Sequence, residues 1–283
     1  MNYSLLKYPR RLSNLGDYIQ SLAAKAFLPR VDQFISRERL GAYRGEATKL
    51  IMNGWYAHSA AHWPPSPAIE PLLTSFHLNS GRREALLTPD AIAYFQSWQP
   101  IGCRDQFTAE TLQQRGIEAY FSGCLTLTLG SYQHDELIRD EVLFVDVPLG
   151  LLKRPDALRT ERSVRRAAAS AKSQNERLFF DCFDCGLIAK AKVITHKPTP
   201  LQNNPSSAFA CAEALLHRYA RARAVVTTRI HCALPCLAMG TPVVFVNLSQ
   251  KETKTCRFGG LLELLNYISI GLDGSLQSNL SGQ

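Results

Sequence analysis

The sequence lacks any long, uninterrupted apolar stretch. No segment approaches the ~20 apolar residues that cross a bilayer without a proline, a glycine or a charge in between. The opening segment, MNYSLLKYPRRLSNLGDYIQ, also lacks the apolar core of a secretory signal. Both absences argue against a membrane-spanning or secreted protein and favour a cytoplasmic one.

The common motifs of nucleotide-binding, zinc-protease and serine-hydrolase sites are missing as well. The chain contains no G-x-x-x-x-G-K-[ST], G-x-G-x-x-G, H-E-x-x-H or G-x-S-x-G. Its basic residues are mostly dispersed and are not interleaved with aromatic residues, which argues against nucleic acid as a partner. Any function therefore rests on less common patterns.

The eight cysteines do not have the spacing of a disulfide framework or of a metal site. Most lie in apolar or glycine-flanked segments, as small buried residues of a reducing compartment do. Cys182 and Cys185 form a C-x-x-C pair, but no second pair stands at zinc-site spacing. We therefore expect no structural metal.

The chain that remains is basic and moderately apolar. Its 283 residues are 46% hydrophobic and 20% charged, which is typical of soluble domains, and carry a net charge of +8. This length suits one large α/β unit or two domains of about 140 residues. The positive charge suits small phosphates and carboxylates, or an anionic membrane surface.

Strand and helix patterns alternate along the chain, which predicts a doubly wound α/β fold. A division near 130 to 140 gives two Rossmann-like domains, 1–135 and 136–283, facing a cleft in which a ligand lies at the strand ends. Helices are predicted over 14–28, 88–99, 107–117, 156–172, 206–222 and 231–239. Strands are predicted over 49–55, 71–78, 100–105, 117–129, 142–148, 177–183, 191–198, 224–228 and 242–246.

Arg229 and His231 interrupt the apolar segment VVTTRIHCALPCLAMGTPVVFV. They lie where a strand ends and a helix begins, and free backbone N–H groups and the helix dipole favour an anion there. Arginine offers a planar fork for phosphate or carboxylate, and histidine can exchange a proton near neutral pH. The alternative is that Arg229 pairs with an acid across the interface and His231 caps the helix. Arg104 has the equivalent strand-end position in the first half.

Other polar residues at strand ends and helix starts have a structural and a functional interpretation. Asp17 suits a helix dipole, and His77 ends a strand as hydrogen-bonded structural histidines do. Asn53 and Gly54 form either a tight turn or a place where a ligand approaches the backbone closely. Asp105 follows Arg104 and is expected to orient or cap rather than to catalyse.

Four blocks of the sequence together resemble the polysaccharide pyruvyl transferase family, especially its members in bacterial exopolysaccharide assembly. The resemblance spans about residues 14 to 265, and the middle segment from 130 to 190 holds no motif that aligns. The blocks are NLGDYIQ, NGWYAHSAAHWPPSPAIEPLLTSFHL, GCRDQFTAETLQQRGIEAYFSGCLTLTL and ITHKPT…RAVVTTRIHCALPCLAMGTPVVFV.

The resemblance implies a fold similar to the GT-B glycosyltransferases. It also implies transfer of pyruvate from phosphoenolpyruvate to two hydroxyls of a sugar, which forms a cyclic ketal and releases phosphate. The first domain would then be the acceptor side and the second the phosphoenolpyruvate side. The family's site segments fall on Asn14, Gly16 and Asp17, on Arg104 and Asp105, and on Arg229, Ile230 and His231.

Ketal formation from an enol ether requires one general acid and one general base. We expect His231 to be the acid, with His77 as the rival for that role, and Asp17 to be the base or to position the acceptor. Arg104 and Arg229 would bind phosphate and carboxylate, so no metal or other cofactor is required. A lipid-linked acceptor would place the enzyme at the inner face of the membrane as a peripheral protein.

Two other functions fit the same residues. A GT-B glycosyltransferase would use a nucleotide-sugar donor, and a non-catalytic protein would bind a sugar or an anion without turnover. The first would turn over a sugar nucleotide, and the second is favoured if Arg104, Arg229 and His231 do not face one cleft.

Overall fold

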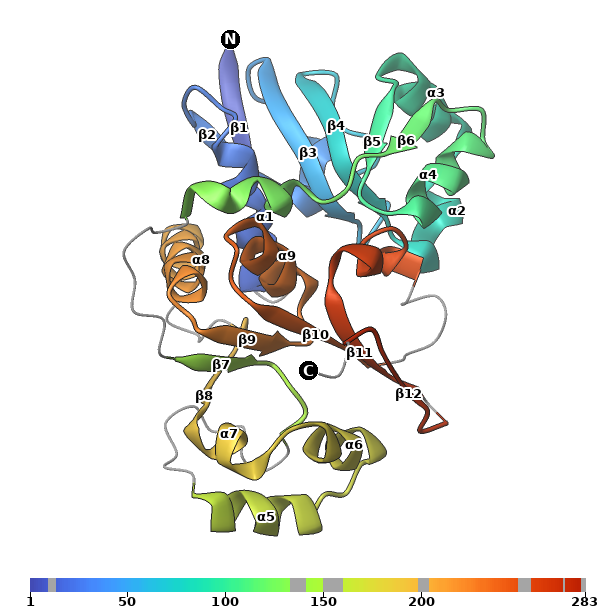
Figure 1. Cartoon of the computed structure of the whole chain (residues 1–283). Helices are drawn as coiled ribbons and strands as arrows, with labels where there is room; N and C mark the ends of the chain where they lie inside the picture. The colour runs from blue at the N-terminus through green and yellow to red at the C-terminus, as the bar shows by residue number, and fades with distance from the viewer. Residues whose placement is uncertain are drawn as a thin grey trace. The chain divides into compact units, whose positions relative to one another are not determined.

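A computed structural model describes residues 1–9, 14–132, 141–149, 160–197, 204–248, 256–271 and 273–280. The chain forms two compact units. Unit 1 comprises Met1–Leu129, Lys197–Glu213 and Lys251–Leu262, and unit 2 comprises Gly130–His196, Ala214–Gln250 and Glu263–Gln283. In the described residues each unit holds one six-stranded sheet with helices beside it (Figure 1).

The sheet of unit 1 is parallel throughout, in the order β2-β1-β3-β4-β5-β6. Its strands are β1 (Asn2–Lys7), β2 (Gln33–Ser36), β3 (Thr48–Tyr56), β4 (Ile69–Leu78), β5 (Ile101–Cys103) and β6 (Ala119–Phe121). Its helices are α1 (Leu15–Lys25), α2 (Arg83–Leu86), α3 (Pro89–Ser97) and α4 (Gln106–Gln113). Short 3-10 helices are η2 (Arg37–Ala42), η3 (Ser80–Arg82) and η7 (Cys256–Phe258).

The sheet of unit 2 has the order β12-β11-β10-β9-β7-β8, and only the β11–β12 pair is antiparallel among the described strands. Its strands are β7 (Val142–Val145), β8 (Lys192–Ile194), β9 (Ala224–Thr227), β10 (Val243–Leu248), β11 (Asn266–Ile270) and β12 (Leu276–Ser278). The helices are α5 (Glu161–Ala169), α6 (Gln174–Cys182), α7 (Cys185–Lys190), α8 (Pro205–Ala220), which begins in unit 1, and α9 (Ile230–Ala238). The 3-10 helices η4 (Leu125–Tyr132) and η8 (Leu262–Leu264) contain the points where the chain passes between units.

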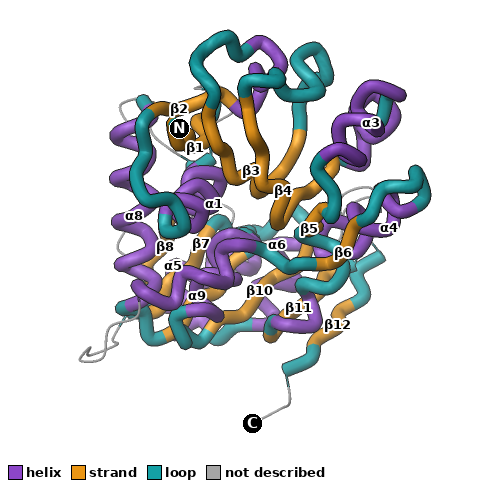
Figure 2. The backbone as a smooth tube through the Cα atoms, turned by 90° about the horizontal axis from the view of Figure 1, so that it is seen from above, coloured by secondary structure: helices purple, strands orange, loops and turns teal. Residues whose placement is uncertain are grey.

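The strand orders place a topological switch point in each unit. In unit 1 the chain moves from β1 to β2 on one side and then to β3 on the other, and in unit 2 it moves from β7 to β8 and then to β9. Figure 2 shows these strands in orange, with helices in purple. Ligands of such sheets bind beyond the carboxyl ends of the strands at the switch point. Two such places therefore exist, one in each unit.

Aromatic side chains fill much of the core in both units. In unit 1 the Phe76 ring stacks on Tyr56 at 4.8 Å and meets Phe95 of α3 edge-on at 5.6 Å. In unit 2 Phe144 of β7 packs edge-on against Phe179 of α6 at 5.8 Å. Sheets covered by helices bury both faces of their strands, so these strands read as continuous apolar runs. The α/β, Rossmann-like fold predicted from the sequence is confirmed, and the finer GT-B arrangement stays a prediction.

The prediction of a strand over 177–183 is wrong, because these residues belong to α6. Ser173 accepts a hydrogen bond from the Glu176 N–H at 3.2 Å, while the Glu176 carboxylate accepts from the Ser173 N–H at 3.3 Å. This capping box is a helix start signal. The apolar triplet behind it, Leu178 to Phe180, is too short to distinguish a strand from a buried helix face.

The predicted strand over 117–129 is correct only near its start, since β6 covers Ala119–Phe121 and η4 begins at Leu125. Gly123, which lies between them, has a φ of +71°, a conformation that a continuing strand would not adopt. The sequence patterns also missed β1, β2, β11 and β12. Within the predicted helix 156–172, the structure describes 160–172, and residues 156–159 lie outside the described residues.

Candidate functional site

Asn14, Gly16 and Asp17 lie at the start of α1, beside the switch point of unit 1. The Asn14 side chain caps the helix by accepting a hydrogen bond from the Gly16 N–H at 3.0 Å. Asparagine is among the best residues for this position. Asp17 lies in the first turn of the helix. The predicted segment therefore builds a helix start that holds a carboxylate near the carboxyl end of β1.

Arg37 is a buried partner of Asp17 that the sequence patterns did not identify. It follows β2 directly, its side chain is 2% exposed, and its Nη1 lies 3.7 Å from Asp17 Oδ1. Its Nε lies 2.9 Å from Glu38 Oε1. The guanidinium lies over the rings of Tyr8 and Trp55, at 4.9 and 5.1 Å. Arg37 was not identified because strand β2 was not predicted. Without that strand, the sequence shows Arg37 only as one of many dispersed basic residues.

The pKa of Asp17 is raised, and burial is the main cause. The positive charges of Arg37, His58 and Arg104 oppose the rise, which means that these residues surround the carboxyl group. Burial disfavours the charged form of a carboxyl group, while nearby cations favour it. Asp17 is thus a carboxyl group whose protonation depends on the charges brought near it.

Asn53 and Gly54 lie in β3 and contact Gln20 of α1. The Asn53 Nδ2 donates to the backbone oxygen of Gln20 at 2.8 Å. Gly54 has a φ of +94°, and a Cβ at this position would stand 2.7 Å from Gln20 Oε1. Gln20 in turn donates to Asp17 Oδ1 at 3.3 Å. The absence of a side chain at Gly54 therefore allows the Gln20 side chain of α1 to lie close to the backbone of β3. The approach of a ligand to this glycine stays a prediction.

His77 and Arg104 stand at the ends of β4 and β5, next to each other in the sheet. Both are 2% exposed. The Arg104 N–H donates to the Phe76 oxygen at 2.9 Å, which fixes the backbone at the strand end. The Arg104 Nε lies 3.7 Å from Asp105 Oδ2. Among the described residues, this Nε has no hydrogen-bond acceptor. A buried guanidinium with donors to spare is suited to an anionic ligand.

Asp105 caps α4 and binds His77 at the same time. Its Oδ1 accepts from the Thr108 N–H at 3.0 Å and from Thr108 Oγ1 at 2.9 Å. Its Oδ2 lies 2.6 Å from His77 Nδ1. The expectation that Asp105 caps a helix is therefore confirmed, and an orienting role in the reaction stays a prediction.

Burial, together with nearby positive charges, favours the neutral form of the His77 imidazole. Burial and the positive charges of Arg104 and Arg257 lower the pKa of His77 to about 4, although Asp105 acts in the opposite direction. Burial would raise the pKa of Asp105, but the hydrogen bonds from His77 and Thr108 and the charge of Arg104 lower it overall. Arg257 belongs to η7, which returns to unit 1 from the far end of the chain. Arg257 was not predicted as a site residue because it lies far along the sequence from the other residues of the site.

In unit 2, Arg229 pairs with Asp146 at the switch point. Arg229 ends the turn after β9 and is the N-cap of α9, but its side chain makes no capping hydrogen bond. Its Nε donates to Asp146 Oδ2 at 2.7 Å, and the side chain stays 35% exposed. Arg229 thus pairs with an acid as in the structural alternative, but that acid belongs to the same unit, and the N-cap is Arg229 rather than His231. The planar guanidinium still has its Nη groups for an anion.

Residues that follow β8 and β9 bind the carboxylate of Asp146. Asp146 follows β7 with a φ of +53° and accepts from Thr195 Oγ1 at 2.6 Å and from the His196 N–H at 3.1 Å. Burial would raise its pKa, yet the hydrogen bond from Thr195 and the charge of Arg229 lower the pKa below its ordinary value. The sequence carried one weak signal of this residue, a lone carboxylate directly after a run of apolar residues.

Ile230 and His231 form the first turn of α9, and each is 9% exposed. The next residue, Cys232, is buried, and hydrogen bonds from Cys236, His196 and Thr227 lower its pKa despite its burial. The expected helix start at Arg229 and His231 is confirmed. Whether His231 acts as an acid stays a prediction.

The predicted site residues thus gather in two groups. Asn14, Gly16, Asp17, Asn53, Gly54, His77, Arg104 and Asp105 lie in unit 1, and Arg229, Ile230 and His231 lie in unit 2. The residues of each group lie at or near the carboxyl ends of strands, at or beside the switch point of a sheet that is parallel in unit 1 and mostly parallel in unit 2. The expectation that both groups face one cleft stays a prediction.

Two findings bear on metals and membranes. Within the described ranges, no three histidine, cysteine, aspartate or glutamate side chains gather as a metal site would require. Cys182 and Cys185 are half-buried free thiols at the end of α6 and the start of α7. Among the described helices, none is long and apolar enough to cross a membrane.

Comparisons with known proteins give one family and one fold. A family model described as polysaccharide pyruvyl transferase matches residues 14–250. The fold is similar to that of a functionally uncharacterised protein from Klebsiella pneumoniae, with a TM-score of 0.50 and 13% identity. That likeness covers 94% of this chain and 92% of the other. A comparison with curated proteins gives no significant match.

Proposed function

The chain belongs to the polysaccharide pyruvyl transferase family, and on this premise we propose that it transfers pyruvate from phosphoenolpyruvate to two hydroxyls of a sugar. The product is a cyclic ketal on an exopolysaccharide or on its lipid-linked precursor, and phosphate is released. The observation that carries the proposal is the pair of strand-end arginines, Arg104 and Arg229. Each follows the carboxyl end of a strand that pairs in parallel with its neighbours, which is where an anion is expected.

Phosphoenolpyruvate carries a phosphate and a carboxylate, and the arginines match this charge. Arg104 is buried and has a carboxylate only 3.7 Å away as a partial counter-charge. Arg229 is partly exposed and keeps its Nη groups for a ligand. Preorganised cations also stabilise the phosphate as it departs. The proposal therefore calls on no metal and no other cofactor.

The reaction begins with a proton delivered to the methylene carbon of the enol ether. His231, in the first turn of α9 and two residues from Arg229, is the proposed acid. The resulting oxocarbenium-like carbon is attacked by a sugar hydroxyl, the phosphate then leaves, and the second hydroxyl attacks the same carbon to close the ketal. Asp17 is proposed to position the acceptor, because a carboxylate accepts hydrogen bonds from sugar hydroxyls. The GT-B arrangement, in which residues of both units would act on one substrate, stays a prediction.

The decisive assay incubates the purified protein with phosphoenolpyruvate and a panel of lipid-linked or synthetic oligosaccharides. Phosphate release and ketal formation are followed by NMR. We expect His231→Ala to lower turnover by ~10²-fold or more with little effect on donor binding. Arg104→Ala is expected to weaken donor binding, and Lys49→Ala, remote at the opposite end of β3, serves as the control. Turnover of a sugar nucleotide in place of phosphoenolpyruvate would overturn the proposal.

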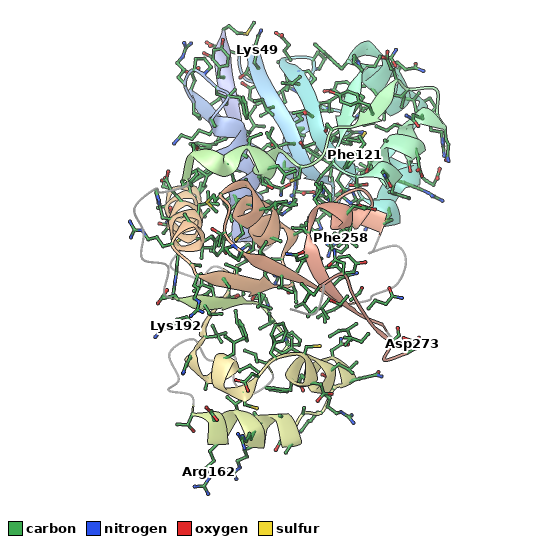
Figure 3. The ribbon with its side chains drawn as sticks, viewed as in Figure 1. Lys49, Phe121, Arg162, Lys192, Phe258 and Asp273 are labelled. Carbon is green, nitrogen blue, oxygen red and sulfur yellow. The ribbon has the colours of Figure 1, made fainter. Side chains whose placement is uncertain are left out.

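A lipid-linked acceptor requires the enzyme to work at a membrane surface from the cytoplasmic side. The helix α5 exposes Arg162, Arg165 and Arg166, and Arg162 projects away from the ribbon (Figure 3). Exposed basic residues attract anionic lipids, and salt screens the attraction. We expect binding to phosphatidylglycerol vesicles at low salt and its loss when the three arginines are changed to glutamine. Binding that is equal with neutral vesicles would contradict this location.

A further inference from the structure

His77 and Asp105 form a buried, hydrogen-bonded pair at the edge of the unit 1 sheet. His77 Nδ1 and Asp105 Oδ2 are 2.6 Å apart. The other carboxylate oxygen is held by the N–H and hydroxyl of Thr108, whose Oγ1 also accepts from the Leu78 N–H at 3.1 Å. Strand and helix thus fix both members of the pair. The orientation of the imidazole follows from the fold.

The protonation states of the pair determine which imidazole nitrogen carries the hydrogen. The pKa of Asp105 is lowered, so its carboxylate is ionised and can only accept. The pKa of His77 is about 4, so its imidazole is neutral at pH 7 and has a single N–H. That hydrogen must lie on Nδ1, between the two residues. Nε2 therefore carries a lone pair and acts as an acceptor.

The Nε2 side of the ring is the side left for a ligand. In the described part of the chain, the hydrogen bonds of His77 go to Asp105 and Thr108, and both involve Nδ1. The charged groups around the ring come from three places: Arg104 after β5, Asp105 at the start of α4, and Arg257 in η7. The two cations suit an anionic donor nearby, and they oppose a cationic imidazole. A proton donor is therefore a poor role for His77 at neutral pH.

We infer that His77 is the general base of the reaction, taking the proton of the attacking sugar hydroxyl on Nε2, and that Asp105 is its positioning residue. The inference rests on the proposed function and assigns a role within it. It separates the two histidines, because His231 keeps the role of the acid. Asp17, whose Oδ1 already contacts Arg37 and Gln20, keeps the role of positioning the acceptor.

The step balances without any further reactant. The hydroxyl oxygen forms a bond to the oxocarbenium-like carbon while its O–H bond breaks and the proton passes to Nε2. Asp105 stabilises the imidazolium that forms, by the hydrogen bond from Nδ1. The bond from that carbon to the phosphate oxygen then breaks, and the phosphate leaves with the electron pair. The proton on Nε2 departs with the phosphate, and the neutral imidazole is restored. The second sugar hydroxyl then attacks the oxocarbenium-like carbon that remains, its O–H bond breaks, and its proton passes to His231, which had given its own proton to the methylene carbon. The ketal is then complete and both histidines have their starting protonation.

The test uses Asp105→Asn, which changes the hydrogen on the imidazole and preserves the helix cap. Asparagine caps helices as well as aspartate does. Its oxygen can stay on Thr108 while its amide donates to His77 Nδ1, which moves the imidazole hydrogen to Nε2 and blocks the base. The matched control is Asp184→Asn, which changes the N-cap of α7, where Asp184 Oδ1 accepts from Gly186 and Leu187.

We expect Asp105→Asn to lower single-turnover ketal formation by about 10³-fold or more, with phosphoenolpyruvate binding changed less than about threefold. Asp184→Asn is expected to behave like the wild type. Nitrogen-15 NMR of histidine-labelled full-length protein at pH 7 should place the hydrogen of His77 on Nδ1 in the wild type and on Nε2 in Asp105→Asn.

Two results would overturn the inference. One is a wild-type imidazole with its hydrogen on Nε2, or protonated on both nitrogens, at pH 7. The other is normal ketal formation by a folded Asp105→Asn variant. Failure of the wild type to form a ketal with any acceptor would instead overturn the proposed function, and the NMR measurement, which needs no turnover, keeps the two failures apart.

Discussion

At the scale of single residues, Asp146 is a side chain whose contacts fix the orientation of another side chain, that of Arg229. The left-handed backbone of Asp146 and its hydrogen bonds to Thr195 and His196 lock the carboxylate that holds Arg229. Aspartate and asparagine both tolerate that backbone conformation. A change between them therefore alters the charge without adding strain.

We predict that Asp146→Asn lowers kcat by about 10- to 100-fold, because Arg229 loses the partner that fixes its orientation. Donor binding should change little, since removal of a nearby negative charge offsets the lost orientation. Steady-state kinetics with phosphoenolpyruvate measure both quantities. Glu141→Gln, which removes the acid 3.4 Å from Arg218, is the control. An equal drop in both variants would point to charge alone.

The buried imidazole of His77 also predicts how stability depends on pH. Its pKa is about 4 in the folded protein against an ordinary value of 6.5, so the unfolded chain binds more protons between these values. The free energy of unfolding should therefore fall as the pH drops from 6.5 towards 4, by about 3 kcal/mol from this group.

His77→Asn keeps a donor for Asp105 but removes the titration, so its loss of stability over this range should be smaller. Urea unfolding at pH 6.5 and pH 4.5 measures the difference. His62→Asn, at an exposed position, is expected to keep the wild-type loss. A His77→Asn variant with the full wild-type pH dependence would contradict the assignment.

At the scale of elements, the connection between α1 and β3 depends on Gly54. The residue combines a φ of +94° with a would-be Cβ contact of 2.7 Å to Gln20 Oε1, and Gln20 leads on to Asp17. Gly240 offers a comparison, because its φ is +66° and, its chain neighbours aside, no atom of the described residues lies within 4 Å of a Cβ there. The two glycines separate backbone strain from crowding.

We predict that Gly240→Ala costs about 1 kcal/mol of unfolding free energy and Gly54→Ala about 2 to 4 kcal/mol. Only the second should also reduce ketal formation, because it displaces Gln20 and so disturbs Asp17. Chemical denaturation and the turnover assay measure the two effects. Equal costs at both glycines would mean that Gln20 yields freely.

The elements that carry the site could be predicted from the sequence, while their charged neighbours could not. The apolar runs before His77, Arg104 and Arg229 identify strands by themselves, so those residues were placed correctly at strand ends. Arg37, Asp146 and Arg257 depend on which strand lies beside which. The order of strands is set by contacts between segments that are distant in the sequence, and the hydrophobic periodicity of a single segment does not report those contacts. The capping box of α6 is present in the sequence and indicates a helix start, so this helix could have been predicted.

At the scale of the whole molecule, unit 1 is assembled from three separate stretches of chain. Phe209 of α8 packs against Tyr18 of α1 at 5.0 Å and against Phe34 of β2 at 5.4 Å. The Gln106 N–H, at the start of α4, donates to the Gly259 oxygen at 3.1 Å. A cut after residue 135 removes both contacts.

We predict that a fragment of residues 1–135 unfolds at a lower urea concentration than the full chain and binds a dye that reports exposed apolar surface. Phe209→Ala in the full chain should cost about 2 to 3 kcal/mol for the same reason. Leu276→Ala, at an exposed position of β12, is the control. A fragment with the full chain's midpoint would show that the later stretches add nothing to the unit.

The bond from Gln106 to Gly259 also sets an order of events during protein synthesis. Domains generally fold as units while the chain emerges from the ribosome, beginning with the N-terminal ones. Here the start of α4, where Asp105 stands, gains this partner only after Gly259 has been translated. The start of α4 is therefore completed only after Gly259 is available, and a nascent chain stalled before that point lacks this backbone contact beside the candidate site.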